Sequence, residues 1–201
     1  MLESNEVKHN GGAGVLVSEA AAPTLRQNCI HSGDDAGVLF HQQGQGLVHD
    51  NNVYNNRTYG VAVLGGGCPT LTRNWLHGRR QGGLLVDEGG AGLVEDNEIE
   101  GNTKSGVTLR GACNPTIARN RIHHGRDSGV HAMEGAQGLI EENDIYANAQ
   151  VSRGVASEPL PQPSPSPSCP RCSLTPSSMS TRKGLSLTLP PPLPPPLIPD
   201  P

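Results

Sequence analysis

A repeat of 23 residues constrains the fold of this chain more than any other feature. Asparagine recurs at this spacing from the start of the chain to about residue 150, and an apolar residue follows each asparagine two positions later. The seven asparagines are Asn5, Asn28, Asn51, Asn74, Asn97, Asn120 and Asn143. A fixed period of about 20 to 50 residues is typical of solenoids, in which each repeat packs on its neighbours.

Each repeat contains three short β-prone segments, which are separated by Gly, Asn, Asp or Pro. The segments are too short for helices and too regularly spaced for hairpins. We therefore predict an all-β fold for residues 1–150, a right-handed parallel β-helix of 23-residue coils with about six to seven turns. Equivalent residues then form columns along the axis, with coils about 4.8 Å apart. Inward asparagines in one column can hydrogen-bond along the axis, which assigns them a structural role.

Composition fits a narrow solenoid interior and excludes several functional classes. Aromatic residues make up only 2% of the chain, so Val, Ile and Leu must fill the core. The net charge of −4 gives no general attraction to nucleic acid. No apolar run reaches the roughly 18 residues of a membrane span, and the polar N-terminus does not resemble a signal peptide. We expect a protein of the cytosol or nucleus.

The C-terminal segment, residues 151–201, differs completely from the repeat. Fifteen of the 18 prolines lie between Pro159 and Pro201. Such a composition cannot bury enough apolar surface to offset the entropy of ordering, so we predict a disordered, Pro-rich tail.

Cys169 and Cys172 form a single CxxC, which lacks the second pair that a zinc site of this type requires. No metal or cofactor is expected.

The outward columns supply the candidate binding residues. Side chains one and three places after each asparagine should face solvent, because strand residues alternate between faces. Tyr54, Trp75 and His77 then lie on adjacent coils, and we predict that they form a partner-binding patch, since aromatics supply rigid contact area. His31 and His123 share the column of His77 but recur on every second coil, about 10 Å apart, too far to share one metal.

Charges in the column before the asparagines argue against catalysis. They alternate in sign at the coil spacing, which predicts a salt-bridge ladder on the surface. The column reads Gln27, Asp50, Arg73, Asp96, Arg119 and Glu142. An acid paired with arginine is not available as a catalytic acid or base, so we do not expect an enzyme. The alternative is a carbohydrate-binding or carbohydrate-active β-helix, which needs a groove with carboxylates within about 7 Å of one another.

A second period of 46 residues is superimposed on the first. Pro-Thr-apolar corners begin at Pro23, Pro69 and Pro115, and they alternate with glycine-containing segments at 44–48, 90–94 and 136–140. With the Ile-His pairs at 30–31 and 122–123, this doublet pattern resembles the β-helical repeat domain of the F-box-only 10/11 family over about residues 1–150.

The resemblance implies a non-enzymatic module that recruits the protein substrate of a cullin-RING ubiquitin ligase. In that family a separate F-box engages the ligase adaptor. The sequence contains no F-box, so we do not expect adaptor binding. Met1 precedes the first ladder position by only four residues, so we expect a fragment or isoform of a longer receptor.

Overall fold

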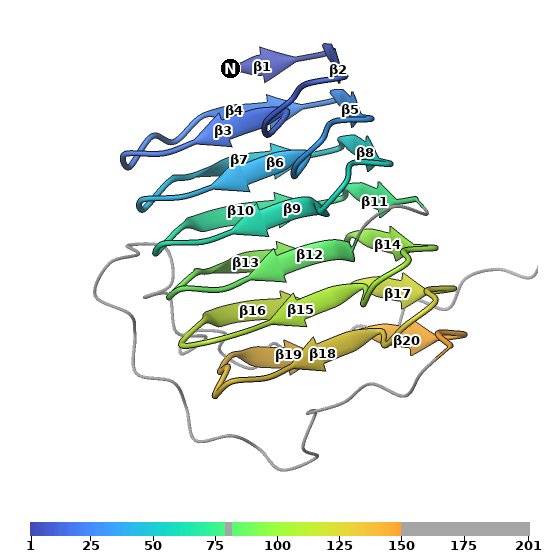
Figure 1. Cartoon of the computed structure of the whole chain (residues 1–201). Helices are drawn as coiled ribbons and strands as arrows, with labels where there is room; N and C mark the ends of the chain where they lie inside the picture. The colour runs from blue at the N-terminus through green and yellow to red at the C-terminus, as the bar shows by residue number, and fades with distance from the viewer. Residues whose placement is uncertain (79–81, 150–201) are drawn as a thin grey trace, which may run out of the picture.

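The chain folds into a parallel β-helix, as predicted (Figure 1). The computed structural model describes residues 1–78 and 82–149, and all regular structure in these ranges is β-strand. Accordingly, neither range contains a helix that is long and apolar enough to cross a membrane. The predicted tail, residues 151–201, with Cys169 and Cys172, lies outside the described residues.

Three parallel sheets, here called A, B and C, run along the solenoid. Sheet A consists of β1 (Leu2–Glu3), β4 (Thr24–Arg26), β7 (Gln45–His49), β10 (Cys68–Thr72), β13 (Ala91–Glu95), β16 (Asn114–Ala118) and β19 (Leu139–Glu141). Sheet B consists of β2 (Glu6–Lys8), β5 (Cys29–His31), β8 (Asn52–Tyr54), β11 (Trp75–His77), β14 (Glu98–Glu100), β17 (Arg121–His123) and β20 (Asp144–Tyr146). Sheet C consists of β3 (Val15–Val17), β6 (Val38–Phe40), β9 (Tyr59–Val63), β12 (Gly82–Val86), β15 (Val107–Leu109) and β18 (Val130–Ala132).

The register of the sheets equals the repeat length. Leu76 pairs with Val53 on one side and with Ile99 on the other, each 23 residues away. These apolar side chains are fully buried, and with their equivalents from sheets A and C they form one continuous core. The interior is filled by Val, Ile and Leu, with Phe40 as its one phenylalanine. The predicted aromatic-poor core is therefore confirmed.

The asparagine column points inward and forms a hydrogen-bonded ladder. Asn74 is buried, and its Nδ2 donates to Oδ1 of Asn97 at 3.0 Å and to the carbonyl of Val48 at 2.8 Å. Its Oδ1 accepts from the backbone N–H and from Nδ2 of Asn51, both at 3.0 Å. One amide thus satisfies groups on two neighbouring coils, which agrees with the predicted structural role.

The bend between sheets A and B is made by the residue just before each ladder asparagine. These residues are not glycine, yet their φ angles lie between 52° and 57°: Ser4, Gln27, Asp50, Arg73, Asp96, Arg119 and Glu142. Nδ2 of Asn51 donates to the carbonyl of His49 at 3.0 Å, and Asn97 bonds Glu95 in the same way at 2.9 Å. The side-chain amide of the ladder asparagine therefore hydrogen-bonds across the residue with positive φ and stabilises its left-handed conformation. A positive φ at this corner therefore does not require glycine.

The glycine column that begins each sheet C segment serves close backbone approach. A Cβ on Gly37 would lie 2.5 Å from Cγ1 of Val53 and 2.7 Å from the carbonyl oxygen of Gly60. The same column includes Gly83, where a Cβ would lie 2.5 Å from the carbonyl oxygen of Gly106. Only glycine leaves room for the neighbouring coil there.

The period of 46 residues has its origin in an alternating proline–glycine column in sheet A. Pro69 pairs in register with Gly46, and Gly92 pairs with Pro115. Gly46 and Gly92 have φ angles of +125° and +122°, a region that side chains rarely adopt. A Cβ on Gly92 would lie 2.3 Å from the carbonyl oxygen of Pro69. A proline on one coil therefore accompanies a glycine on the next, and the structural repeat is a pair of coils.

A shorter asparagine series, which was not predicted, recurs at the same 46-residue spacing. It consists of Asn56, Asn102 and Asn148. Oδ1 of Asn56 accepts from the backbone N–H of Gly33 at 3.0 Å, while its Nδ2 donates to the carbonyl of Ile30 at 3.2 Å. The series stabilises the loop that leaves sheet B.

Candidate functional site

The three predicted partner-binding residues lie together on the outer face of sheet B. Tyr54 belongs to β8, and Trp75 and His77 belong to the next strand, β11. The rings of Tyr54 and His77 are stacked with centroids 5.1 Å apart, and those of Trp75 and His77 are stacked at 3.9 Å. His31 extends the stack, because its ring lies 4.6 Å from Tyr54 and nearly parallel to it. We call these four side chains the aromatic face.

The aromatic face combines exposure with a fixed conformation. Trp75 is 43% exposed, whereas its stacking partner His77 is half-buried. Burial lowers the pKa of His77, while the nearby Glu100 carboxylate opposes this shift. His77 is therefore neutral at pH 7, and its Nε2 contacts Oδ1 of Asn52 at 2.9 Å. The result is a preorganised platform of aromatic rings.

A shallow groove of charged residues adjoins Trp75. It is lined by Arg73, Trp75, Asp96, Glu98, Arg119 and Arg121. Its two acids are paired: Arg119 Nε lies 3.2 Å from Asp96, and Arg121 Nη1 lies 3.0 Å from Glu98. These carboxylates are neutralised by their arginine partners and are not free for acid–base chemistry.

The predicted alternation of charge before the asparagines appears as ion pairs between coils. Arg73 Nε bonds Asp50 at 2.8 Å across 23 residues. This bond, with a second from His49, lowers the pKa of Asp50 to about 2. Because these groups are largely exposed, the pairs contribute little to stability and mainly keep the column soluble.

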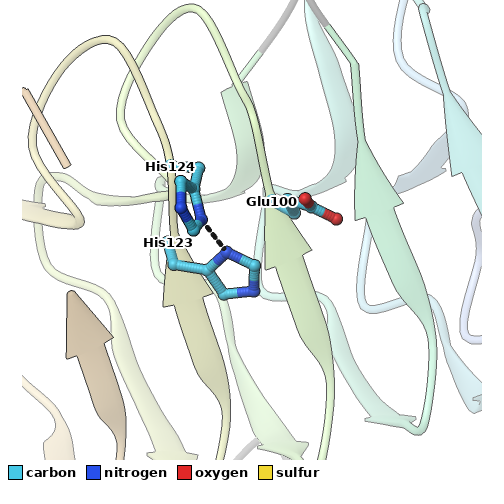
Figure 2. A group of neighbouring side chains, drawn as sticks. All are labelled: Glu100, His123 and His124. Carbon is cyan, nitrogen blue, oxygen red and sulfur yellow. Dashed lines mark hydrogen bonds between the residues drawn. The ribbon is translucent and has the colours of Figure 1, made fainter. Parts of the chain in front are cut away.

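A second cluster of ionisable groups was not predicted. Glu100, His123 and His124 bring one possible ligand atom each within 4.8 Å of one another. Figure 2 shows the two imidazoles meeting through their Nδ1 atoms, with Glu100 on the adjacent strand. His123 is only 5% exposed, although its column was expected to face solvent. Tyr146 covers it, with ring centroids 4.7 Å apart.

The sequence contained one signal for this cluster. The adjacent histidines His123 and His124 follow Glu100 by about one repeat length, so the three lie on neighbouring coils. In the structure His31, His77 and His123 recur on every second coil of the register, as predicted. Because strand residues alternate between faces, the period of the sequence alone does not predict that His123 and His124 meet.

Comparison with known proteins gives one match. The family of right-handed beta helix regions matches residues 1–76 and 65–158. Neither the curated proteins nor the solved structures contain a significant match to the chain.

Proposed function

Because the chain belongs to the right-handed β-helix family, with rigid parallel faces, we propose that it is a non-enzymatic protein-interaction module. Its partner binds across the aromatic face of sheet B and the adjoining groove. The observation that carries this proposal is the continuous stack from His31 through Tyr54 and His77 to Trp75.

The physical argument rests on preorganisation. Stacked rings have already lost most of their rotamer freedom, so a partner that covers them does not have to order them. Aromatic side chains are enriched among the residues that dominate binding energy, particularly where a rim of surrounding contacts excludes water from them. The groove beside Trp75 supplies such a rim, with Arg73, Arg119 and Arg121 as cations.

The resemblance to the F-box-only 10/11 family refines the proposal. The partner is then a protein substrate of a ubiquitin ligase, met in the cytosol or nucleus. We do not expect residues 1–78 and 82–149 to bind the cullin-RING adaptor, because an F-box is a helical unit and all regular structure in these ranges is β-strand.

Carbohydrate binding is the alternative, since sugars also stack on exposed indoles. The groove next to Trp75 favours it less, because both of its acids, Asp96 and Glu98, are paired with arginine. A glycosidase would need two carboxylates that are free to act as an acid and a base or nucleophile.

Substituting Trp75 with alanine tests the proposed interface. We expect about a thirtyfold loss of affinity for the captured partner, equivalent to roughly 2 kcal/mol, because the indole is the most exposed ring of the aromatic face. The loss of the Trp75–His77 stack should lower the free energy of unfolding by only about 0.5 to 1.5 kcal/mol. Quantitative affinity capture and chemical denaturation measure the two effects.

Leu139→Ala is the matched control. Leu139 is 44% exposed, almost the same as Trp75, but lies on β19 of sheet A. Its substitution should leave partner capture unchanged. Equal partner capture by Trp75→Ala and the parent chain would show that the interface lies elsewhere on the solenoid. If Trp75→Ala weakened the binding of an oligosaccharide and left protein capture unchanged, the carbohydrate alternative would be favoured. Direct binding of the purified chain to the ligase adaptor would contradict the assigned role.

A further inference from the structure

Three histidines of sheet B share one orientation. In each, Nε2 faces the side chain 25 residues earlier: His31 faces Glu6 at 3.4 Å, His77 faces Asn52 at 2.9 Å, and His123 faces Glu98. In His31 and His123 the opposite nitrogen, Nδ1, contacts the residue that follows in the chain. His31 Nδ1 lies 3.0 Å from Oγ of Ser32, and His123 Nδ1 lies 2.6 Å from Nδ1 of His124.

The backbone at the corner after the strand explains how adjacent residues can meet. In a continuous strand, successive side chains point to opposite faces. At this corner the chain instead adopts a positive φ, which is 55° at Ser32 and 53° at His124. The turn brings the side chain of His124 back beside His123, as Figure 2 shows.

The hydrogen bonds around His123 fix its tautomer. Glu98 is a carboxylate clamped by Arg121 at 3.0 and 3.1 Å, so it can only accept a hydrogen bond, and His123 must carry a proton on Nε2. The Nδ1 atom of a neutral His123 then presents a lone pair toward His124. A carboxylate that holds the far nitrogen of an imidazole is the usual outer-shell arrangement of a metal-binding histidine.

We propose that Glu100, His123 and His124 form a zinc-binding site, in which Glu98 is the positioning residue for His123. Two imidazole nitrogens and one carboxylate oxygen are a ligand set that suits Zn²⁺, whereas Mg²⁺ and Ca²⁺ prefer oxygen ligands alone. The ion takes the place of the proton between the two Nδ1 atoms and ties β14 to the corner after β17.

Modest side-chain movements complete this geometry. Zinc–ligand bonds of about 2.0 to 2.1 Å place tetrahedral ligand atoms about 3.3 Å apart. The two Nδ1 atoms, now 2.6 Å apart, must separate. The Glu100 carboxylate oxygen, which lies within 4.8 Å of one nitrogen of each imidazole, must move closer to both. His124 is exposed and Glu100 is half-buried, so both can rotate, while Tyr146 and Glu98 hold His123 in place. Three protein ligands leave the fourth position open to water or to an incoming ligand.

The second coil provides an internal comparison, because it has the same geometry without the ligand set. There Glu6, His31 and Ser32 occupy the positions of Glu98, His123 and His124, and Lys8 occupies that of Glu100. A lysine and a serine in place of a carboxylate and an imidazole do not form a zinc site. Of these two equivalent places, only the one at His123 has three ligands.

Calorimetric titration of the full chain with ZnCl₂ tests the proposal. We expect the parent chain to bind one Zn²⁺ at this site. The His124→Ala and Glu100→Gln variants should lose Zn²⁺ binding, or lose more affinity than the factor of about 10–100 that is typical of a change in an outer-shell residue. Glu98→Gln, which still contacts His123, should fall within that outer-shell range. Both His124 and Glu100 reach the surface, so circular dichroism should show an unchanged fold in their variants.

His9→Ala is the matched control, because His9 is an exposed histidine at the same corner of the first coil, with φ of 54°. It should bind Zn²⁺ like the parent. With Co²⁺ as a spectroscopic probe, the visible bands lost in His124→Ala should lack the charge-transfer band of a cysteine thiolate. Absence of Zn²⁺ binding by the parent, or binding that neither His124→Ala nor Glu100→Gln weakens, would overturn the proposal.

Discussion

Replacement of Gly92 by alanine is expected to lower the free energy of unfolding by about 2 to 5 kcal/mol. Part of this loss, about 1 to 2 kcal/mol, is the strain of a side chain at a positive φ, here +122°. The remainder, about 1 to 3 kcal/mol, comes from overpacking, since the new Cβ would lie 2.3 Å from the carbonyl oxygen of Pro69. Urea denaturation followed by circular dichroism measures the difference.

Gly89→Ala separates the two contributions. Gly89 lies three residues earlier in the same coil and also has a positive φ, +75°, but no atom lies within 4 Å of its added Cβ. Its substitution should therefore cost only the conformational strain, about 1 to 2 kcal/mol. Equal losses for Gly89→Ala and Gly92→Ala would show that the contact with Pro69 is not what requires glycine at Gly92.

Replacement of Asn74 by leucine is expected to cost about 3 kcal/mol or more, because each buried polar group that loses its partner costs about 1 to 3 kcal/mol. The variant deprives Asn51 of the acceptor for its N–H and Nδ2 groups, and it leaves the Val48 carbonyl without the donor at 2.8 Å. A similar side-chain volume keeps the packing change small, so the loss reports mainly on the ladder. Thermal and chemical denaturation measure it.

Asn5→Leu is the corresponding control at the end of the ladder. Asn5 is exposed, and its amide donates to Glu3 and to Asn28 at 2.9 and 3.0 Å. Water can replace these partners, so the expected loss is below about 1 kcal/mol. An unchanged stability of Asn74→Leu would argue that the ladder contributes nothing beyond filling space.

The sequence alone determined the architecture and most of the aromatic face. A period of 23 residues places every residue beside its equivalents one coil away, since parallel strands stack in register. The inward position of Asn74, the buried column through Leu76 and the proximity of Tyr54 to His77 all follow from counting in steps of 23 and of two. The stack of Trp75 on its own strand neighbour His77 could not be obtained in this way, because it depends on rotamers.

The tertiary structure decided what happens at the corners. Periodicity specifies which residues are neighbours along the axis, but it does not specify the φ of the residue that joins two strands. A positive φ at Asp50 and its equivalents turns the chain from sheet A to sheet B, although none of these residues is a glycine. At His124 the same conformation brings the side chain back beside His123, and the ring of Tyr146 buries His123. The cluster with Glu100 therefore follows from a backbone angle at His124, which the period of the sequence does not specify.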